Sequence, residues 1–422
     1  MADKTVLVIA YYFPPMGLSG VQRTAKFVKY LPEFGWNAIV LSCDPKSYYA
    51  YDSSLMEELD NDDIEIIRAS SNPGKEARKR NTRKFPNYFI QKTGRAVLQT
   101  IYQPDSKIKW KKYAVEAGEK IIQEHDVNAI FATAPPFTDF LVARDLSDKY
   151  KIPFVVDYRD IWVDNPFHFY ATPFHKNYSI RLESEILTKS EKAVVITRQA
   201  KETLLKRYRL LSHSDISIIP HGFDPQDFQF EQPVLKDPSK FVITHSGLFQ
   251  DDRTPKYFLK ALKNFLDSNK EAAYRLEAKF VGLMRPAHEK MIRKMKLENN
   301  VSITGYLTHK DAVRELLKSD VLWLTFNDTV RTPGKLYEYF GARKPIIILS
   351  PDGAMRQIAM ESGAAFPADP KDIKLIEKHL KKLFKLWQEK LLPKPSEDFA
   401  KNYDRRLLTE KLAIELSHIA QI

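Results

Sequence analysis

Residues 332–348 read TPGKLYEYFGARKPIII, and this stretch holds the pattern from which the fold of the chain can be worked out. A Pro-Gly pair precedes a run of apolar residues at helical spacing that carries Lys335 and Glu338, which predicts a short helix. A Lys-Pro pair then leads into consecutive isoleucines, a pattern typical of a strand that is buried on both faces. A helix followed directly by such a strand is the repeating unit of an α/β protein with a parallel sheet.

The same alternation of helices and apolar strands continues along the whole chain in two series. The strands of the first series are expected at residues 5–10, 37–42, 64–69, 128–133, 152–158, 192–197 and 216–220. Those of the second series are expected at residues 240–247, 276–282, 300–305, 320–326 and 344–350. Residues 221–240 contain three prolines and little periodicity, so we interpret them as a linker. Two doubly wound α/β sheets are therefore predicted.

The length of the chain agrees with this division. A chain of 422 residues is too long for one ordinary hydrophobic core and suits two domains. We predict an N-terminal Rossmann-like domain over residues 1–230 and a C-terminal Rossmann-like domain over residues 231–402. A helical and strongly charged end follows over residues 403–422.

The positive charge of the chain is concentrated in one window. Much of the net charge of +12 comes from residues 73–112, which hold twelve basic residues and two acidic ones. Aromatic side chains lie among these charges, and the combination suits an anionic membrane surface, a nucleic acid or a solvated basic loop. We expect this window to contact the acceptor or a membrane, through Arg78, Arg80, Arg83, Lys84 and Trp110.

Several classes of site are not indicated by the sequence. No apolar run approaches the roughly 18 residues of a membrane span, and the N-terminal stretch reads as a strand rather than an export signal. The single Cys43 excludes an intramolecular disulfide and suits a reducing cytoplasm. The zinc spacing H-x-x-x-H, the P-loop motif and the common Ser- and Cys-nucleophile motifs are absent, so the residues give no reason to expect a metal or another cofactor.

The loop after the first strand, YYFPPMGLSGVQR at residues 11–23, holds Gly17 and Gly20 just before a predicted helix. Glycines at this place let backbone N–H groups approach a phosphate at the helix N-terminus, although a plain glycine turn would show the same pattern. A later loop, APPFTDF, holds Thr138 and Asp139, of which one is expected to cap the next helix.

Charged residues follow the apolar stretch PFVV at residues 153–156, in the segment VVDYRDIWVDNPF. Asp157, Arg159 and Asp160 would be expensive to bury at a strand end without a use. They can form an internal Arg–Asp salt bridge that shapes the loop, contact a substrate, or do both.

The second series carries its candidate residues at the ends of its strands. Gly247 ends a predicted strand, and Arg253 and Lys256 flank a proline at a predicted helix start, where two cations can bind a diphosphate. They can equally be surface cations paired with neighbouring aspartates. Lys335 opposes the dipole of its own helix, which indicates a bound anion unless the lysine simply pairs with Glu338.

Taken together, these segments resemble glycosyltransferase family 4, whose members have the GT-B fold. The resemblance extends over nearly the whole chain and lies in the order and spacing of YYFPPMGLSGVQRTAKFVKYLPEFGW, DYRDIW, AVVIT, IIPHGFD, SGLFQDDRTP and PGKLYEYFGARKPIIIL. The segment QPDSKIKW at residues 103–110 also resembles a subgroup that acts in surface-polysaccharide assembly.

The resemblance implies an α/β protein of two Rossmann-like, doubly wound domains that face a central cleft, with the final helix crossing back to the first domain. The C-terminal domain would bind a nucleotide-diphospho-sugar and the N-terminal domain the acceptor. Transfer would retain the anomeric configuration and need no metal. Carried onto this sequence, Arg253 and Lys335 would bind the donor diphosphate and Glu338 the ribose, with Gly247 and Lys256 beside them in the donor site.

The resemblance assigns roles in the first domain as well. Gly17 and Gly20 would face the donor phosphates, and Arg159 or Asp160 falls where many members have a histidine near the reacting sugar. We therefore count Arg159 and Asp160, with Arg253 and Lys335, as candidate catalytic residues. The chain departs from the family at Val330, where many members have an acidic residue.

The leading hypothesis is a nucleotide-sugar-dependent hexosyltransferase that acts on a glycan or lipid-linked acceptor in surface polysaccharide or lipopolysaccharide synthesis. Such a protein is expected in the cytoplasm or at the inner face of the plasma membrane. Two alternatives stay open. One is a nucleotide-sugar epimerase of the same fold, which needs no acceptor. The other is a non-enzymatic nucleic-acid-binding protein, which only the basic window and the high isoelectric point suggest.

Overall fold

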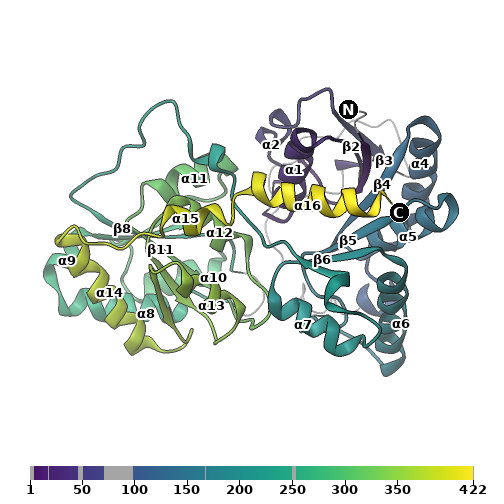
Figure 1. The fold of residues 1–422 in the computed structure, drawn as a ribbon. Coiled ribbons are helices and arrows are strands. Elements are labelled where there is room, and N and C mark those ends of the chain that lie inside the picture. The colour runs from purple at the N-terminus through teal and green to yellow at the C-terminus, as the bar shows by residue number, and fades with distance from the viewer. Residues whose placement is uncertain are drawn as a thin grey trace. The chain divides into compact units, whose positions relative to one another are not determined.

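The computed structural model of the chain describes residues 4–17, 19–45, 51–70, 98–166, 168–249 and 253–421. The chain forms two compact units (Figure 1). Unit 1 consists of Met1–Pro220 together with Arg406–Ile422, and unit 2 consists of His221–Arg405. Among the helices of the described residues, none combines the length and the apolar character that crossing a membrane requires.

Unit 1 is built around a parallel sheet of seven strands in the order β3-β2-β1-β4-β5-β6-β7. The strands are β1 (Lys4–Ile9), β2 (Trp36–Cys43), β3 (Ile64–Ala69), β4 (Val127–Ala134), β5 (Phe154–Tyr158), β6 (Lys192–Val195) and β7 (Ile216–Ile218). The α-helices described in this unit are α1 (Ser19–Tyr30), α2 (Ser54–Glu57), α4 (Lys111–Glu124), α5 (Thr138–Tyr150), α6 (Pro173–Lys189), α7 (Arg198–Arg207) and α16 (Arg405–Ile419). Short 3-10 helices are η1 (Leu31–Phe34), η3 (Ile108–Trp110) and η4 (His213–Asp215).

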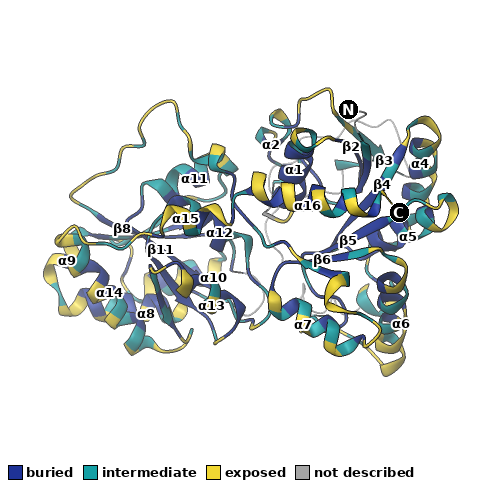
Figure 2. Ribbon diagram, viewed as in Figure 1, coloured by how far each residue is buried: buried dark blue, intermediate teal, exposed yellow. Residues whose placement is uncertain are grey.

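The strands of unit 1 are buried on both faces, as their continuous apolar sequences predict. Val6 and Val8 of β1 pack in one apolar cluster with side chains of α1 and α16, whereas Leu7 and Ile9 alternate with them and are also buried. Figure 2 shows the strands in dark blue and the exposed residues on the outer sides of the helices. The last helix of the chain thus completes the core of the first unit.

Unit 2 repeats the design with a parallel sheet of six strands in the order β10-β9-β8-β11-β12-β13. The strands are β8 (Phe241–Ser246), β9 (Leu276–Val281), β10 (Val301–Ile303), β11 (Val321–Thr325), β12 (Ile346–Leu349) and β13 (Ala365–Ala368). The helices are η5 (Pro225–Phe228), α8 (Lys256–Ser268), α9 (Lys270–Arg275), α10 (Pro286–Lys294), α11 (His309–Leu317), α12 (Gly334–Ala342), α13 (Ala354–Glu361), α14 (Ile373–Gln388) and α15 (Glu397–Lys401).

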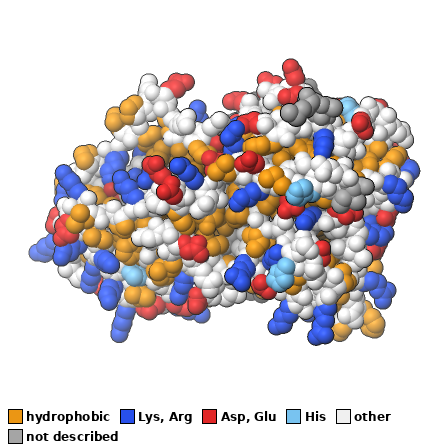
Figure 3. All heavy atoms as spheres, viewed as in Figure 1, with side chains coloured by type: hydrophobic (Ala, Val, Ile, Leu, Met, Phe, Trp, Pro, Cys, Tyr) orange, Lys and Arg blue, Asp and Glu red, His pale blue; other side chains and the backbone are white. Residues whose placement is uncertain are grey.

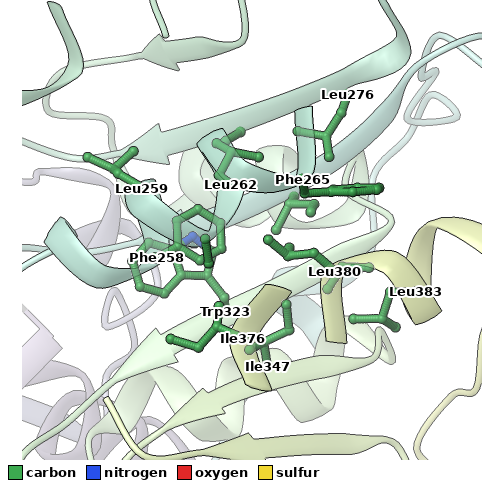
Figure 4. Packing of buried hydrophobic residues seen from close by; sticks show 14 of the residues in the cluster. Phe258, Leu259, Leu262, Phe265, Leu276, Trp323, Ile347, Ile376, Leu380 and Leu383 are labelled. Carbon is green, nitrogen blue, oxygen red and sulfur yellow. The ribbon is translucent and has the colours of Figure 1, made fainter. Parts of the chain in front are cut away.

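The two faces of the second sheet have separate cores. Trp323 and Ile347 point toward α8 and α14, where the rings of Phe258 and Trp323 stack with centres 4.0 Å apart (Figure 4). Leu322 and Ile346, one residue earlier in each strand, join a cluster with residues of α12 on the other face. This alternation is what a fully buried parallel strand requires, and it confirms the prediction of two doubly wound α/β units.

One strand was not predicted from the sequence. β13 has the sequence AFPA and pairs with β12 alone at the edge of the second sheet. Pro367 has no backbone N–H, so it is tolerated in an edge strand but not in a central one. Because the strand has only four residues and one of them is a proline, the apolar pattern of the sequence does not predict it.

The segment predicted to be a linker begins as part of unit 2. The backbone N–H of Phe223 donates to the carbonyl of Tyr403 at 2.9 Å, and the N–H of Arg405 donates to the carbonyl of Phe223 at 2.9 Å. A Cβ on Gly341 would lie 2.5 Å from the ring of Phe223, so glycine is needed there for this close contact. Unit 2 therefore begins at His221, ahead of the predicted boundary at residue 231.

Candidate functional site

Three glycines follow neighbouring strands at the carboxyl edge of the second sheet. Gly247, Gly282 and Gly305 follow β8, β9 and β10 and have φ angles of 127°, 125° and 73°, which L side chains rarely adopt. The backbones come close together, because the N–H of Gly247 donates to the carbonyl of Val281 at 2.8 Å and that of Gly282 to Gly305 at 3.0 Å. This edge is therefore lined by main chain, which a ligand can approach closely.

Cations gather beside this main-chain surface. The guanidinium carbon of Arg253 lies 5.4 Å from the ring centre of Phe326, which follows β11, and that of Arg331 lies 5.7 Å from the same ring. Each such contact contributes on the order of 0.5–1 kcal/mol. Two like charges on one ring repel each other, so an anion bound between or beside them would be stabilised.

The start of α12 brings a third cation to the same region. Lys335 lies in the first turn, which contains no acidic residue, and its Nζ is 2.8 Å from Oε2 of Glu338. The carboxylate is buried, with 5% of its side chain exposed. The predicted local pair is therefore present. It holds the ammonium group near the positive end of the helix dipole, where an anionic ligand is favoured.

His245 shows that two of the cations lie in one site. The pKa of His245 is lowered to about 3, mainly by burial and to a smaller extent by the positive charges of Arg253 and Lys335. Nδ1 of His245 lies 3.1 Å from the carbonyl oxygen of Trp323, so Nδ1 carries the proton of the neutral ring. The imidazole is stacked on Phe249 at 4.4 Å between ring centres. Arg253 and Lys335, which are 82 residues apart in the chain, thus both lie close enough to the carboxyl end of β8 for their charges to act on His245.

The structure gives a role to the acidic residue near Val330. Oδ1 of Asp328 accepts hydrogen bonds from the backbone N–H groups of Val330 at 2.8 Å and Arg331 at 2.7 Å, and Oδ2 accepts from Nε of Arg331 at 2.8 Å. A Cβ on Gly353 would lie 2.5 Å from the backbone of Thr329, so this loop is held tightly against α13. Asp328 shapes the loop that positions Arg331, and Val330 contributes a backbone N–H to it.

Lys256 is less closely connected with this site. It is the first residue of α8, its side chain is exposed, and its Nζ lies 5.6 Å from the ring centre of Tyr257. The flanking Asp251 and Asp252, which were considered as surface partners of the cations, lie outside the described residues.

In unit 1 Asp157, near the end of β5, pairs with a residue of α1 and not with an arginine of its own loop. The guanidinium of Arg23, on α1, donates from Nη2 to Oδ1 of Asp157 at 2.8 Å and from Nε to both carboxylate oxygens. Both side chains are buried, with 1% and 0% exposed. Thr133 donates to Oδ2 of Asp157 at 2.7 Å. The salt bridge expected within the loop is therefore formed with a helix 134 residues away.

Arg159 connects the loop after β5 with the first turn of α1 and with the loop after β4. Its Nη1 donates to the carbonyl of Gly20 and its Nη2 to the carbonyl of Pro135. The side chain is buried, and burial lowers the pKa of the Arg159 guanidinium. These contacts make Arg159 a residue that positions the main chain. Gly17 and Asp160, the other candidates here, are partly buried, whereas Gly20 is exposed.

The cap of α5 comes from a distant segment and not from the helix itself. Oδ2 of Asp105 accepts from the backbone N–H of Thr138 at 3.0 Å, and Oδ1 accepts from its hydroxyl at 2.9 Å. Asp139 instead accepts from the backbone N–H of Tyr11 at 2.9 Å, and burial raises the pKa of this carboxyl well above its usual value. The prediction that Thr138 or Asp139 caps the helix is wrong, because both side chains hold other loops.

Trp110 is also a structural residue, which corrects its prediction as an acceptor or membrane contact. Its indole N–H donates to the carbonyl of Ala69 at 3.1 Å, and its ring meets the edge of Tyr11 at 5.1 Å between centres. With 7% of its surface exposed, it cannot enter a lipid surface. The other predicted contacts, Arg78, Arg80, Arg83 and Lys84, lie outside the described residues.

Sequence reasoning missed a buried carboxyl on α6. Oε2 of Glu183 accepts from the hydroxyl of Tyr208 at 2.7 Å and from the N–H of Val163 at 3.3 Å, whereas Oε1 has no hydrogen-bond partner among the described residues. Burial raises the pKa of Glu183 to about 7. The only sequence signal is that Glu183 lies one residue after Leu182 and three before Ile186, on the buried face of the helix.

Replacing Glu183 by glutamine should change how stability depends on pH. The folded-state pKa of Glu183 is raised from 4.5 to about 7, so the folded protein binds more protons than the unfolded one in this range. Its contribution to the free energy of unfolding is complete below pH 4.5 and is lost as the pH rises through 7. The difference between wild type and Glu183→Gln should change by about 3 kcal/mol across this range. Urea unfolding at a series of pH values measures it.

The control for this prediction is Glu185→Gln, an exposed carboxylate on the same helix with 40% of its side chain exposed. This variant retains Glu183 and should keep most of the wild-type slope. A difference between wild type and Glu183→Gln that is the same at every pH would contradict the prediction.

Comparison with known proteins places this geometry in a family. Residues 23–227 match the family model described as Glycosyltransferase Family 4, and residues 226–405 match the one described as Glycosyl transferases group 1. The chain matches none of the curated proteins with which it was compared.

Solved structures with the same fold include enzymes of more than one kind. A glycosyltransferase from Rickettsia africae is 16% identical with a TM-score of 0.66, and 99% of each chain is covered. Anabaena Alr3699/HepE in complex with UDP and glucose is 13% identical with a TM-score of 0.64, over 98% of this chain and 100% of that one. A putative UDP-N-acetylglucosamine 2-epimerase from Listeria monocytogenes is 14% identical with a TM-score of 0.61, over 100% and 98%.

These structural similarities show the GT-B fold, and the family models identify the two halves in sequence order. Together the models extend from residue 23 to residue 405 and match one half to each of the two Rossmann-like units. The chain therefore belongs to glycosyltransferase family 4 and has the GT-B fold.

Proposed function

We propose that the protein transfers a hexosyl group from a nucleotide-diphospho-sugar to a glycan or lipid-linked acceptor in surface polysaccharide or lipopolysaccharide synthesis. The proposal is carried by the position of Lys335 in the first turn of α12 and of Arg253 against the ring of Phe326, the residue that follows β11. These positions place two cations beside a helix N-terminus and a main-chain surface at Gly247. A diphosphate fits this combination of charge and open backbone.

In this proposal three residues of unit 2 bind different parts of the donor. Arg253 and Lys335 bind the diphosphate, and the carboxylate of Glu338, held by Lys335, accepts a hydrogen bond from a ribose hydroxyl. The donor therefore lies along the carboxyl edge of the sheet, as ligands of open parallel sheets do. In this proposal the acceptor is bound by unit 1.

The chemistry proposed for the site follows from where charge develops. The bond between the anomeric carbon and the diphosphate oxygen breaks, and its electron pair stays on the diphosphate. The acceptor oxygen bonds to the same carbon and gives up its proton to the departing diphosphate oxygen. Cations that are already in place stabilise the departing diphosphate, so transfer does not depend on a metal. Retention of configuration requires the acceptor to attack from the face that the diphosphate leaves.

Nucleotide sugars test the proposal directly. The full chain is mixed with UDP-, GDP- and dTDP-sugars in the presence of EDTA, and thermal unfolding is recorded. A donor at about 100 times its dissociation constant should stabilise the protein by about 2.7 kcal/mol. If none of the nucleotide sugars stabilised the protein, the proposal would be overturned. Conversion of the donor to its epimer without any acceptor, followed by NMR, would identify the isomerase instead.

A further inference from the structure

One surface of unit 1 exposes large hydrophobic side chains where the proposed reaction makes no use of them. They come from the helical turn at residues 98–101, from the loop after β5, and from the first two turns of α6. We call them the apolar patch, and they are Leu98 (44% exposed), Ile101 (64%), Phe169 (48%), Phe174 (82%) and Tyr178 (49%).

Hydrogen bonds tie the three segments of the apolar patch together. The backbone N–H of Phe169 donates to Oε1 of Gln99 at 3.0 Å, and the hydroxyl of Ser179 donates to Oε1 of Gln103 at 3.1 Å. Phe174 and Tyr178 are four residues apart on α6 and share one face of the helix. The patch is therefore one surface built from segments about 70 residues apart in the chain, as the separation of Gln99 and Phe169 shows.

The segments that form the apolar patch carry mainly positive charge, although Lys111 is paired with Asp145 and Glu185 follows Arg181 one turn later on α6. Residues 98–112 and 168–182 contain a single acid, Asp105, and its carboxylate is used to cap α5. Figure 3 shows hydrophobic and basic side chains together at the lower right, over α6. The cations of these two segments are Lys107, Lys109, Lys111, Lys112, Lys176 and Arg181. Lys109 lies over the ring of Tyr102, with Nζ 5.1 Å from its centre.

We propose that the apolar patch inserts into an anionic lipid surface, with Phe174 entering the acyl boundary and the surrounding cations contacting the headgroups. Aromatic side chains flanked by basic ones are the composition of interfacial membrane segments. A second copy of this chain is a poor occupant, because self-association would bring two sets of cations together. The proposal goes beyond the transfer reaction, and it rests on that reaction only in that a lipid-linked acceptor would be met at such a surface.

Vesicle flotation of the full chain tests this surface without using catalysis. Vesicles of phosphatidylcholine alone are compared with vesicles that also contain phosphatidylglycerol. The wild type should float with the anionic vesicles and not with the zwitterionic ones. Phe174→Ser should weaken binding to the anionic vesicles about tenfold, because one large ring no longer leaves water. Lys176→Glu combined with Arg181→Glu should abolish binding at moderate salt.

Tyr274→Ser is the matched control, because this aromatic side chain on unit 2 is 81% exposed and lies outside the patch. It should bind vesicles like the wild type. Equal recovery of the wild type with both kinds of vesicle, or equal binding by Phe174→Ser and Tyr274→Ser, would overturn the proposal. A dimer in light scattering that Phe174→Ser dissociates would also overturn it, in favour of self-association.

The two proposals fail in distinguishable ways. Phe174→Ser should keep the thermal shift that a nucleotide sugar produces, because the substitution is in unit 1 and the donor residues are in unit 2. Loss of donor stabilisation in the wild type would remove the transferase and leave the lipid surface standing. Failure of the wild type to float with anionic vesicles would remove the lipid-surface proposal and leave the transferase proposal unaffected.

Discussion

Asp157→Ala should lower the free energy of unfolding of the protein by about 3–5 kcal/mol, because it leaves a buried guanidinium without its carboxylate. Arg23 has 1% of its side chain exposed and gives three hydrogen bonds to Asp157. Its remaining donors reach the backbone carbonyls of Ile219 and Pro220. Loss of Asp157 would therefore loosen the contact between α1 and the chain after β7. Urea unfolding followed by circular dichroism measures the change.

An exposed ion pair in the same chain provides the control. Arg343 pairs with Glu397, whose side chain is 66% exposed, and Glu397→Ala should change stability by less than about 1 kcal/mol. A loss of less than 1 kcal/mol for Asp157→Ala would show that the buried guanidinium finds other partners, and it would contradict the prediction. Replacing Arg23 by methionine and Asp157 by leucine together should recover part of the loss, since the unpaired charge is removed.

The periodicity of the sequence was enough to find the architecture. The strand predicted at residues 344–350 is β12, and the helix before it is α12. Apolar residues that continue without a polar interruption can only be satisfied inside a covered parallel sheet, so the class of fold follows from them. The N-terminal helix shows the same relation, because Val21, Ala25, Val28 and Leu31 follow one another at helical spacing in the sequence and all four are buried.

The partners of polar residues could not be found by the same reasoning. A salt bridge within its own loop was one alternative for Asp157, but its partner is Arg23, and Thr138 is held by Asp105 rather than by its own helix. Periodicity shows which face of an element is buried, but it does not show which element lies against it. Contacts between residues far apart in the chain depend on the order of strands in the sheet, which no local pattern determines.

The candidate donor site was predicted only in part. Lys335 and Arg253 were chosen from the sequence, and the structure brings both to His245. Arg331 was not chosen, because nothing in its own segment shows that it shares the ring of Phe326 with Arg253. Val330 looked like a missing acidic residue, whereas the structure shows Asp328 folding the loop around it.

Arg253→Ala should reduce the rate of sugar transfer, as kcat/KM, by about 30- to 1,000-fold, which corresponds to about 2–4 kcal/mol of lost transition-state stabilisation. If the reaction is the one proposed, Arg253 meets the diphosphate as the sugar–phosphate bond breaks and its charge increases. The main loss should then appear in kcat, with a smaller change in KM. The cation–π contact of Arg253 with the ring of Phe326 contributes on the order of 0.5–1 kcal/mol, so the loss of this contact should change the stability of the fold only slightly.

Two variants decide whether such a loss belongs to Arg253 itself or to any nearby cation. Lys256→Ala removes an exposed cation three residues further along the chain, so it should reduce kcat/KM by less than about threefold. Arg253→Lys keeps the charge but not the planar fork that binds two phosphate oxygens, so it should recover only part of the lost rate. Release of nucleoside diphosphate, measured with each purified variant at saturating acceptor, gives all three rates. Wild-type transfer by Arg253→Ala would remove Arg253 from the diphosphate site and leave Lys335 and the start of α12 as its main determinants.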